Sequence, residues 1–405
     1  MILDTITTKA QRQREKIGQD SEVFGRPIDD KKSVNMSGSS LHFCVCVLIF
    51  CMRWFVASFF PITVVFFLSA CGKEPLYLEQ GYVFGTLVEV SVYGEDEARA
   101  KQSVSSVMLE FQRLHDLLHA WQPSALSELN AAFANGESGE VASELTAMLT
   151  DVVQLSEQSD GLFNPAIGSM VKLWGFQANE FKPTLPDENQ LAALVAAHPQ
   201  MSDIYFSNSS FPANGKEGWI GSHNVAVQLD LGGYAKGYAL DRAVTLLKQQ
   251  GIRNALINIG GNVLAIGTHG SRSWRVGIQH PRQPGPIATL ELHDGEAIGT
   301  SGDYQRYFMV GNKRYCHLID PRNGRPVQGV QAVTVLTHGA RAGVLSDATS
   351  KPLFISGSQG WRSAAKKMNL TEALLIDESG TVHLTAELQK RLEFTAKNTV
   401  TKVVP

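Results

Sequence analysis

The sequence predicts an α+β fold for one domain that spans about residues 80–395. Helical hydrophobic patterns dominate the first half of this region, whereas the second half is rich in short strand-like segments joined by glycine-marked turns. Such a mixture of helices and hairpins favours α+β over a regular doubly wound sheet. The 405 residues, 43% of them apolar, leave room for two to three folding units at roughly 150 residues each. No internal repeat or interior linker divides the region, so we expect a single domain.

The helices and strands can be assigned in order from hydrophobic periodicity and turn residues. The first helix is the clearest, because Val104, Val107, Phe111, Leu114 and Leu118 recur at three- and four-residue steps. Glycine and proline mark the turns, including a ligand-contacting loop at 161–168. The expected helices are 104–118, 140–159, 188–197 and 234–250; the expected strands are 82–90, 225–231, 255–259, 274–279, 287–292, 306–310, 314–319 and 332–336; the expected turns in the second half are 311–313 and 320–326.

The charge balance argues against nucleic acid as a partner. The chain has 36 Lys and Arg residues against 39 Asp and Glu residues, a formal net charge of -3 at pH 7. Binding to a phosphate backbone needs a cationic field that this composition does not supply. The 8% aromatic content also argues against a largely disordered chain.

The N-terminal region resembles a bacterial lipoprotein signal. Starting at Met52, a positive residue, an apolar stretch and small residues precede Cys71, in the order of a cleavable signal peptide. We therefore expect residues 52–70 to be the signal and Cys71 to be lipidated. A transmembrane helix within residues 41–70 is the alternative, since about 20 apolar residues span a bilayer.

Lipidation would anchor the body to the periplasmic side of a bacterial inner membrane. Residues 1–51 are then an upstream over-extension or a disordered tail, and residues 71–79 are a linker. Cysteine usage fits this division, because four of the five cysteines fall within residues 44–71 and only Cys316 lies in the body. A disulfide framework in the body is excluded.

A glycine-rich motif, Gly232–Gly237, connects the expected strand 225–231 to the expected helix 234–250. Free N–H groups and the helix dipole at such a position favour a phosphate. The motif matches neither the dinucleotide fingerprint nor the P-loop, so a tight strand-to-helix turn stays open as the alternative. Asp230 and Lys236 flank the turn and make a binding role more attractive.

Histidines supply the candidate acid–base groups. His317 precedes Asp320 by three residues and has the chemistry for proton transfer near pH 7, with a structural role beside a hairpin as the alternative. His115 and His119 could share one helix face as a zinc pair. The Glu of the HExxH pattern is missing there, so we favour helix-end histidines. The Gly-x-Ser-x-Gly elbow of a serine hydrolase is also missing from the sequence.

The motifs together resemble the ApbE-type FAD:protein FMN transferases, a family of often lipid-anchored enzymes outside the cytoplasm. The resemblance covers nearly everything after Cys71 and rests on the order and spacing of several segments. They are Phe84-Gly85-Thr86, Leu162-Phe163-Asn164-Pro165, Leu173-Trp174-Gly175-Phe176, Asp230 to Tyr238, Asn258 to Asn262, Thr300 to Tyr304 and His317 to Pro326.

The resemblance implies a T-fold-like α/β domain and transfer of FMN from FAD to a Thr or Ser hydroxyl of an acceptor protein, with AMP released. It implies an acceptor in a membrane redox complex, such as sodium-pumping NADH:quinone reductase or an Rnf-type complex. His317 becomes the acid–base candidate, with Asp303 next. The alternatives are a non-catalytic periplasmic flavin-binding lipoprotein and a membrane-anchored scaffold. The implied flavin nucleotide contacts are Phe84, Trp121, Leu162, Phe163, Asn164, Asp230, Lys236 and Ile319.

The resemblance also implies a magnesium site formed by the Gly233 carbonyl, Asp347 and Ser350. Lys351 stands where the family commonly has a threonine ligand, and its ammonium could instead supply charge to the pyrophosphate as a catalytic group. We expect one magnesium that binds only with FAD, because magnesium prefers few carboxylates plus phosphate and water oxygens. An exposed aspartate at a helix start is the alternative for Asp347.

Overall fold

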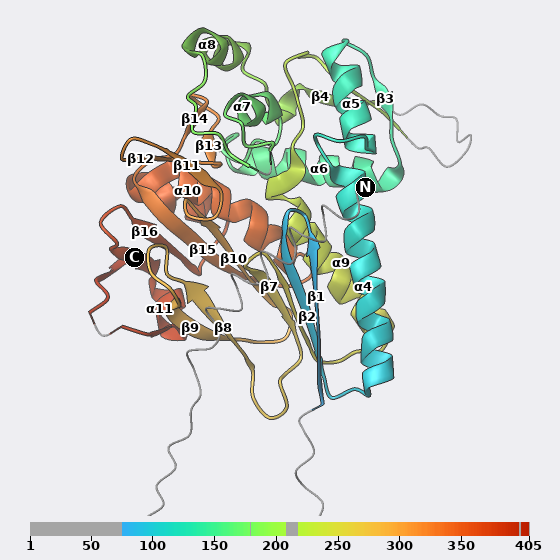
Figure 1. Cartoon of the computed structure of the whole chain (residues 1–405), viewed down its shortest axis with the longest axis vertical. Helices are drawn as coiled ribbons and strands as arrows, with labels where there is room; N and C mark the ends of the chain where they lie inside the picture. Colours follow the sequence, from blue (N-terminus) through green and yellow to red (C-terminus); the bar gives the residue numbers. More distant parts are fainter. Residues whose placement is uncertain (1–74, 179, 208–217, 397, 405) are drawn as a thin grey trace, which may run out of the picture. The chain divides into compact units, whose positions relative to one another are not determined.

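A nine-stranded sheet forms the centre of the described chain (Figure 1). The computed structural model describes residues 75–178, 180–207, 218–396 and 398–404. Neighbouring strands are antiparallel except for the last pair, which is parallel. In spatial order the strands are β1 (Leu76–Val83), β2 (Thr86–Tyr93), β6 (Ala255–Ile259), β7 (Asn262–Ile266), β10 (Glu296–Gly302), β15 (Val330–His338), β16 (Ala373–Asp377), β17 (Val382–Thr385) and β19 (Thr401–Val404).

Each face of the sheet buries its own set of apolar side chains, as the two-residue period of strands requires. Three long helices cover one face: α4 (Glu97–Leu118), α9 (Ala235–Gln249) and α10 (Ala342–Lys367). A small sheet covers the other face together with α11 (Ala386–Arg391). That sheet contains β18 (Glu393–Phe394), β9 (Pro286–Leu292) and β8 (Trp274–Gln279). These layers confirm the α+β prediction.

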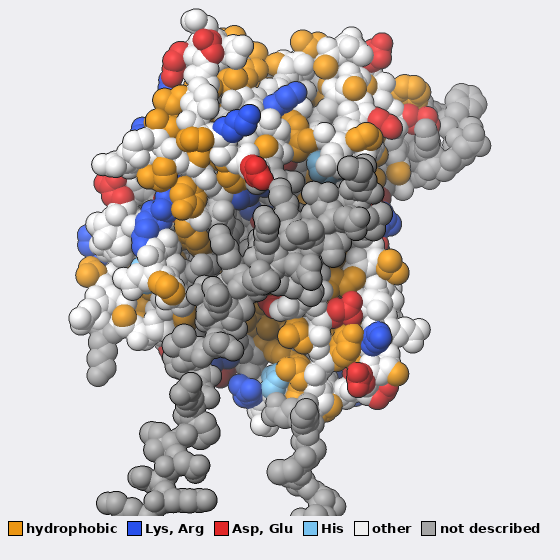
Figure 2. Space-filling view, in the orientation of Figure 1, with side chains coloured by type: hydrophobic (Ala, Val, Ile, Leu, Met, Phe, Trp, Pro, Cys, Tyr) orange, Lys and Arg blue, Asp and Glu red, His pale blue; other side chains and the backbone are white. Residues whose placement is uncertain are grey.

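Shorter elements lie beyond one end of the large sheet (Figure 1). Their helices are α5 (Ala125–Ala134), α6 (Ser143–Gln158), α7 (Gly168–Leu173) and α8 (Glu188–Ala197). Their strands are β3 (Gly139–Glu140), β4 (Ile204–Ser207), β5 (Trp219–Ser222), and the hairpins β11 (Tyr307–Val310) with β12 (Lys313–Cys316) and β13 (Ile319–Asp320) with β14 (Arg325–Pro326). Figure 2 shows basic and acidic side chains interspersed with apolar ones over the visible face.

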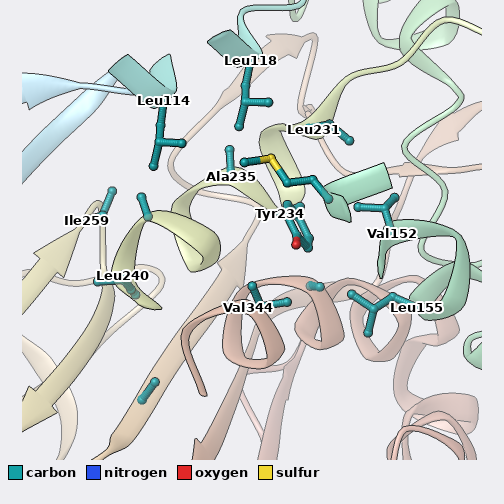
Figure 3. Close-up of a cluster of buried hydrophobic side chains, with 14 of the residues drawn as sticks. Leu114, Leu118, Val152, Leu155, Leu231, Tyr234, Ala235, Leu240, Ile259 and Val344 are labelled. Atoms are coloured by element: carbon teal, nitrogen blue, oxygen red, sulfur yellow. The ribbon is translucent and has the colours of Figure 1, made fainter. Parts of the chain in front are cut away.

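Packing fixes the turn that leads into α9. A short 3-10 helix, η2 (Leu231–Gly233), precedes α9, and Tyr234 between them is only 2% exposed. Figure 3 shows apolar side chains from several elements converging around this turn. Burying a Leu, Ile or Val side chain of this set contributes about 1.5–3 kcal/mol. Those labelled come from α4 (Leu114, Leu118), α6 (Val152, Leu155), the turn and α9 (Leu231, Tyr234, Ala235, Leu240), β6 (Ile259) and α10 (Val344).

Two glycines allow α9 and α10 to touch through their backbones. A Cβ atom added to Gly237 would lie 2.4 Å from the Gly343 carbonyl oxygen, and one added to Gly343 would lie 2.4 Å from the Gly237 carbonyl oxygen. Real Cβ atoms do not approach other atoms so closely, so a side chain at either position would force the helices apart. The crossing sets the distance between the start of α9 and the polar residues of α10.

We predict that Gly237→Ala lowers the free energy of unfolding by about 2 kcal/mol, because overpacking against backbone atoms cannot be relieved by a side-chain rotation. Urea denaturation of the folded chain measures the change. Gly81→Ala is the matched control, since its added Cβ would meet Val88 and Met108 side chains at 3.5 and 3.6 Å, which is ordinary contact. Equal effects of the two substitutions would contradict the proposed close crossing.

Three of the expected strands are wrong. The run 314–319 is interrupted, since β12 ends at Cys316 and β13 begins a separate hairpin at Ile319. The run 82–90 is broken by a turn at Phe84 and Gly85, whose φ angles are 54° and 70°, so it belongs to the β1–β2 hairpin. The run 225–231 forms only an isolated bridge, between Ile167 and Gln228. There the backbone N–H of Gln228 donates to the Ala166 carbonyl at 3.1 Å, which ties the run to a loop instead of a sheet.

The sheet extends beyond the limits expected from the sequence. β1 begins at Leu76, within the expected linker 71–79, and β19 follows residue 395. The tail 1–51, the signal 52–70 and Cys71 lie outside the described residues. Among the residues that are described, we find no helix with both the length and the apolar character needed to cross a bilayer.

Candidate active site

Asp347 lies between two lysines at the contact of α9 and α10, and we call Lys236, Asp347 and Lys351 the lysine cluster. The Asp347 side chain is only 1% exposed, so the alternative of an exposed helix-start aspartate is wrong. The Lys236 ammonium lies 3.4 Å from Asp347 Oδ1. The Lys351 ammonium donates to the same oxygen and, at 2.6 Å, to the Asp347 backbone carbonyl.

The lysine cluster is positively charged as a whole. Burial alone would raise the pKa of Asp347, but Lys236 and Lys351 outweigh it and hold that pKa below its ordinary value. Burial lowers the pKa of Lys351 to about 8, against the opposing pull of Asp347. One carboxylate therefore faces two ammonium groups at neutral pH, which is an arrangement able to attract an anion.

The start of α9 is closed by protein groups. The backbone N–H of Gly237 donates to Asp347 Oδ2 at 3.1 Å, so a carboxylate already lies at this helix N-terminus, where the helix dipole favours an anion. The Asp230 side chain accepts from the Gly232 N–H at 2.9 Å, and Lys236 donates to the Gly232 carbonyl at 3.1 Å. The glycine-rich motif thus forms a tight turn into α9, and phosphate binding at this turn stays a prediction.

His317 is half-buried and lies within electrostatic reach of the lysine cluster. Its Nδ1 lies 3.3 Å from the Arg306 carbonyl. Because a carbonyl only accepts, Nδ1 carries the proton of the neutral ring and Nε2 keeps its lone pair. Loss of surrounding water, then the charges of Arg306, Lys236 and Lys351, lower the pKa of His317 to about 3. The imidazole is therefore neutral at physiological pH.

Arg306 is a site residue that sequence reasoning missed. Besides its carbonyl contact with His317, its guanidinium donates to the Phe176 carbonyl and lies 5.4 Å above the Phe181 ring. No motif in the sequence marks it, since it falls just after the Thr300 to Tyr304 segment. Its proximity to His317 arises only because β11 and β12 fold back on each other.

Asp303 is held in ion pairs. Arg282 contacts both carboxylate oxygens, at 2.7 and 2.6 Å, and Arg314 lies 3.3 Å from one of them. Both guanidinium groups therefore hold the Asp303 carboxylate in place. The structure thus gives Asp303 an anchoring role between the β8–β9 connection and β12.

The rings of Phe84, His115 and His119 pack together near the end of α4, and we call them the aromatic wall. The Phe84 ring meets His115 edge-on with centroids 5.8 Å apart, and His115 meets His119 in the same way at 5.2 Å. His119 Nδ1 accepts from the backbone N–H groups of Trp121 and Gln122, at 3.1 and 3.0 Å. That use of Nδ1 and the edge-on rings support helix-end histidines over a zinc pair. The described residues contain no cluster of three or more His, Cys, Asp or Glu side chains suited to a metal.

Phe163, in the loop after α6, lies next to the lysine cluster, whereas the Asn164 side chain hydrogen-bonds to backbone groups of the protein. A Cβ built on Gly233 would lie 3.4 Å from the Phe163 ring and 3.3 Å from Lys351 Cε, so these three residues adjoin. The Asn164 amide donates to the Pro199 carbonyl at 2.9 Å and accepts from the Ala166 N–H at 3.1 Å. Leu162 is half-buried beside Phe163.

Ile319 lies away from the lysine cluster's polar groups, in a small apolar cluster of its own. It is 4% exposed and packs with Trp174, Phe176 and Phe308. This cluster supports the two short hairpins that carry His317, because His317 follows β12 directly and precedes β13 by two residues. Ile319 therefore positions the histidine's loop.

The polar residues behind the lysine cluster include one unpaired donor. Ser350 Oγ donates to the Asp347 carbonyl at 2.8 Å and lies 2.7 Å from Ser301 Oγ. Asn262 accepts from the Thr300 N–H at 3.3 Å, but its buried Nδ2 has no partner among the described residues. A buried amide without a partner is costly, so Asn262 is a candidate for contact with a ligand's acceptor atom.

The chain is similar to one protein family, to named relatives and to solved structures. A family model described as the ApbE family matches residues 84–375. A Rhodobacter capsulatus protein named FAD:protein FMN transferase is 42% identical over 315 residues, which cover 78% of this chain and 58% of that protein. A Klebsiella pneumoniae protein of the same name is 28% identical, over 74% of this chain and 83% of that protein. The crystal structure of the ApbE protein of Thermotoga maritima matches with a TM-score of 0.69 and 26% identity, over 78% of this chain and 99% of that chain.

Proposed function

The chain belongs to the ApbE family, and we propose on that basis that it is an FAD:protein FMN transferase. The resemblance inferred from the sequence motifs is thereby confirmed. In the proposed reaction, a Thr or Ser hydroxyl of an acceptor protein attacks the phosphorus on the FMN side of the FAD pyrophosphate. The phosphoester bond forms, the bond to the bridging oxygen breaks, and AMP leaves with that oxygen.

The observation that carries this function is a neutral histidine within electrostatic reach of the Lys236 and Lys351 ammonium groups. His317 Nε2 accepts the hydroxyl proton, which typically contributes about 10²- to 10⁴-fold in rate. Lys236 and Lys351 meet the negative charge that grows on the phosphate oxygens. The aromatic wall and Phe163 offer apolar faces for the ring systems of FAD. Turnover needs each of these parts, whereas a flavin-binding protein without activity needs no base beside the phosphate.

The test is a reaction of the purified chain with FAD and an acceptor domain taken from a membrane redox complex. We expect AMP in solution, seen by chromatography, and an acceptor that gains one FMN, seen by mass spectrometry. An acceptor with its target hydroxyl removed is the control and should stay unmodified. If FAD binds and AMP is not released with any acceptor, the non-catalytic flavin-binding alternative is favoured.

The lipid anchor is part of the proposal, supported by the sequence pattern before Cys71. We expect wild-type cells to incorporate a labelled fatty acid into this protein and to hold it at the periplasmic side of the inner membrane. Cys71→Ser should leave the chain unlabelled and unprocessed, while Cys51→Ser is the control and should change nothing. A wild-type chain that is unlabelled and free of membranes would contradict the anchor.

Magnesium is the component of the implied reaction that these residues do not fit. The carboxylate and carbonyl of Asp347 already accept from Lys351, and Ser350 donates its hydroxyl proton to the same carbonyl. An ammonium group thus lies where the resemblance implies a metal ligand. We assign magnesium no step in the proposed reaction.

A further inference from the structure

We propose that the ammonium group of Lys351 takes the place of the divalent metal that the family resemblance implies, so that this chain transfers FMN without a metal ion. The inference rests on the proposed function for its activity measurement. Its structural basis is separate, because it comes from the contacts of Asp347, Ser350 and Gly233. Those contacts allow metal binding to be tested independently of turnover.

The first argument is that every oxygen of Asp347 already accepts from the protein. Oδ1 accepts from Lys351 and lies 3.4 Å from the Lys236 ammonium. Oδ2 accepts from the Gly237 N–H at 3.1 Å. The backbone carbonyl accepts from Lys351 at 2.6 Å and from Ser350 at 2.8 Å. A metal ion would have to displace an ammonium group from the carboxylate and would then lie beside it.

The second argument is that Ser350 is already engaged and that the Lys351 side chain crowds Gly233. Ser350 Oγ pairs with Ser301 Oγ at 2.7 Å while it donates to Asp347. Gly233 lies against the Lys351 stem, since a Cβ built on it would meet Cε at 3.3 Å and Cδ at 3.8 Å. Magnesium demands near-octahedral oxygen coordination at about 2.0–2.1 Å. The Lys351 side chain fills the space that such a shell would need beside Gly233.

The third argument is that Lys351 retains what a metal would contribute to phosphate chemistry. An ammonium group has three N–H donors, and two of them point to Asp347. Among the described residues we find no acceptor for the third, which can donate to a phosphate oxygen. With Lys236 beside it, the lysine cluster keeps a net positive charge, and the same helix that carries Asp347 fixes Lys351 one turn later. The charge is therefore built into the fold and needs no ion from solution.

The experiment compares wild type with Lys351→Thr, which restores the family's usual residue. Lys366→Thr is the matched control, because Lys366 is an exposed lysine on the same helix. FMN transfer is measured in EDTA and in excess magnesium, and Mn²⁺ binding is measured by electron paramagnetic resonance with and without FAD. A blank of FAD and Mn²⁺ alone corrects for ion bound by the nucleotide. Thermal unfolding checks that each variant is folded.

We expect wild type and Lys366→Thr to transfer FMN at the same rate, within about twofold, in EDTA and in magnesium, and to bind no Mn²⁺ beyond the blank. Lys351→Thr should lose about 10²- to 10³-fold in EDTA, regain activity with magnesium, and bind one Mn²⁺. Wild-type transfer that stops in EDTA and returns with magnesium would overturn the inference.

If wild type transfers no FMN under either condition, the proposed function fails, and the inference is then tested by Mn²⁺ binding alone. Mn²⁺ binding by wild type overturns the inference. Mn²⁺ binding only by Lys351→Thr supports it. If Lys351→Thr does not fold, the wild-type measurements decide in the same way.

Discussion

His317→Ala is expected to lower the rate of FMN transfer by about 10²- to 10⁴-fold while FAD affinity stays within about twofold of wild type. In the proposed reaction His317 accepts the hydroxyl proton through Nε2, whereas the aromatic wall and the lysine cluster would hold FAD. Single-turnover transfer and a flavin fluorescence titration measure the two quantities separately. His293→Ala is the control, since His293 is exposed and its Nδ1 lies 3.3 Å from Ser273 Oγ, just before β8.

The same substitution should remove a pH dependence of stability. The pKa of His317 is about 3 in the folded chain and 6.5 in a free histidine. The unfolded chain therefore binds more protons between these values, so stability rises with pH from about 3 to 6.5 and is full above that range. His317→Ala should flatten this rise in urea denaturation. If His317→Ala transfers FMN at the wild-type rate, His317 has a structural role only.

Asp347→Ala is expected to lower the free energy of unfolding by about 3–5 kcal/mol at pH 7 and to abolish FMN transfer, because it leaves the half-buried Lys236 and Lys351 ammonium groups without their buried carboxylate. The loss should be smaller at pH 9, since the pKa of Lys351 is about 8 even with Asp347 present, and the uncompensated lysine can then release its proton. Urea denaturation at the two pH values measures this difference.

The double variant Asp347→Ala with Lys351→Met serves as the control for charge. Removing one uncompensated ammonium should recover part of the lost stability, but not FMN transfer. A loss below about 1 kcal/mol for Asp347→Ala alone, or no recovery in the double variant, would show that the buried charges are not coupled as their contacts indicate.

Much of the fold could be predicted because its helices carry a clear apolar stripe. The expected helices 188–197 and 234–250 agree with α8 and α9 to within a residue. The missed helix, α10, contains Pro352 and a non-helical Gly357, and its first turns are buried almost all round. A helix of this kind has no polar face, so periodicity gives no signal. Its stability comes from packing against β10 and β15.

The site was predicted only in part, for a related reason. Lys351 and Asp347 were both singled out, but their contact follows from four-residue spacing on a helix that the sequence did not reveal. The run 225–231 alternates as a strand would, yet a side-chain bond from Asn130 to the Leu229 carbonyl at 2.9 Å holds it as a loop. A hydrogen bond between residues far apart in the sequence cannot be predicted from a local hydrophobic pattern.

The order of the large sheet has a consequence for engineering the two ends of the described chain. The first strand, β1, and the last strand, β19, are also its two outermost strands, so each protects the backbone groups of its neighbour. Removing residues 401–404 would uncover the N–H and C=O groups of β17, and unpaired strand edges recruit strands from other molecules. Shortened versions of this protein should therefore self-associate with rising concentration. Fusions placed beyond these strands leave β2 and β17 paired with their outer neighbours, which makes the segments outside Leu76 and Val404 the safer points of attachment.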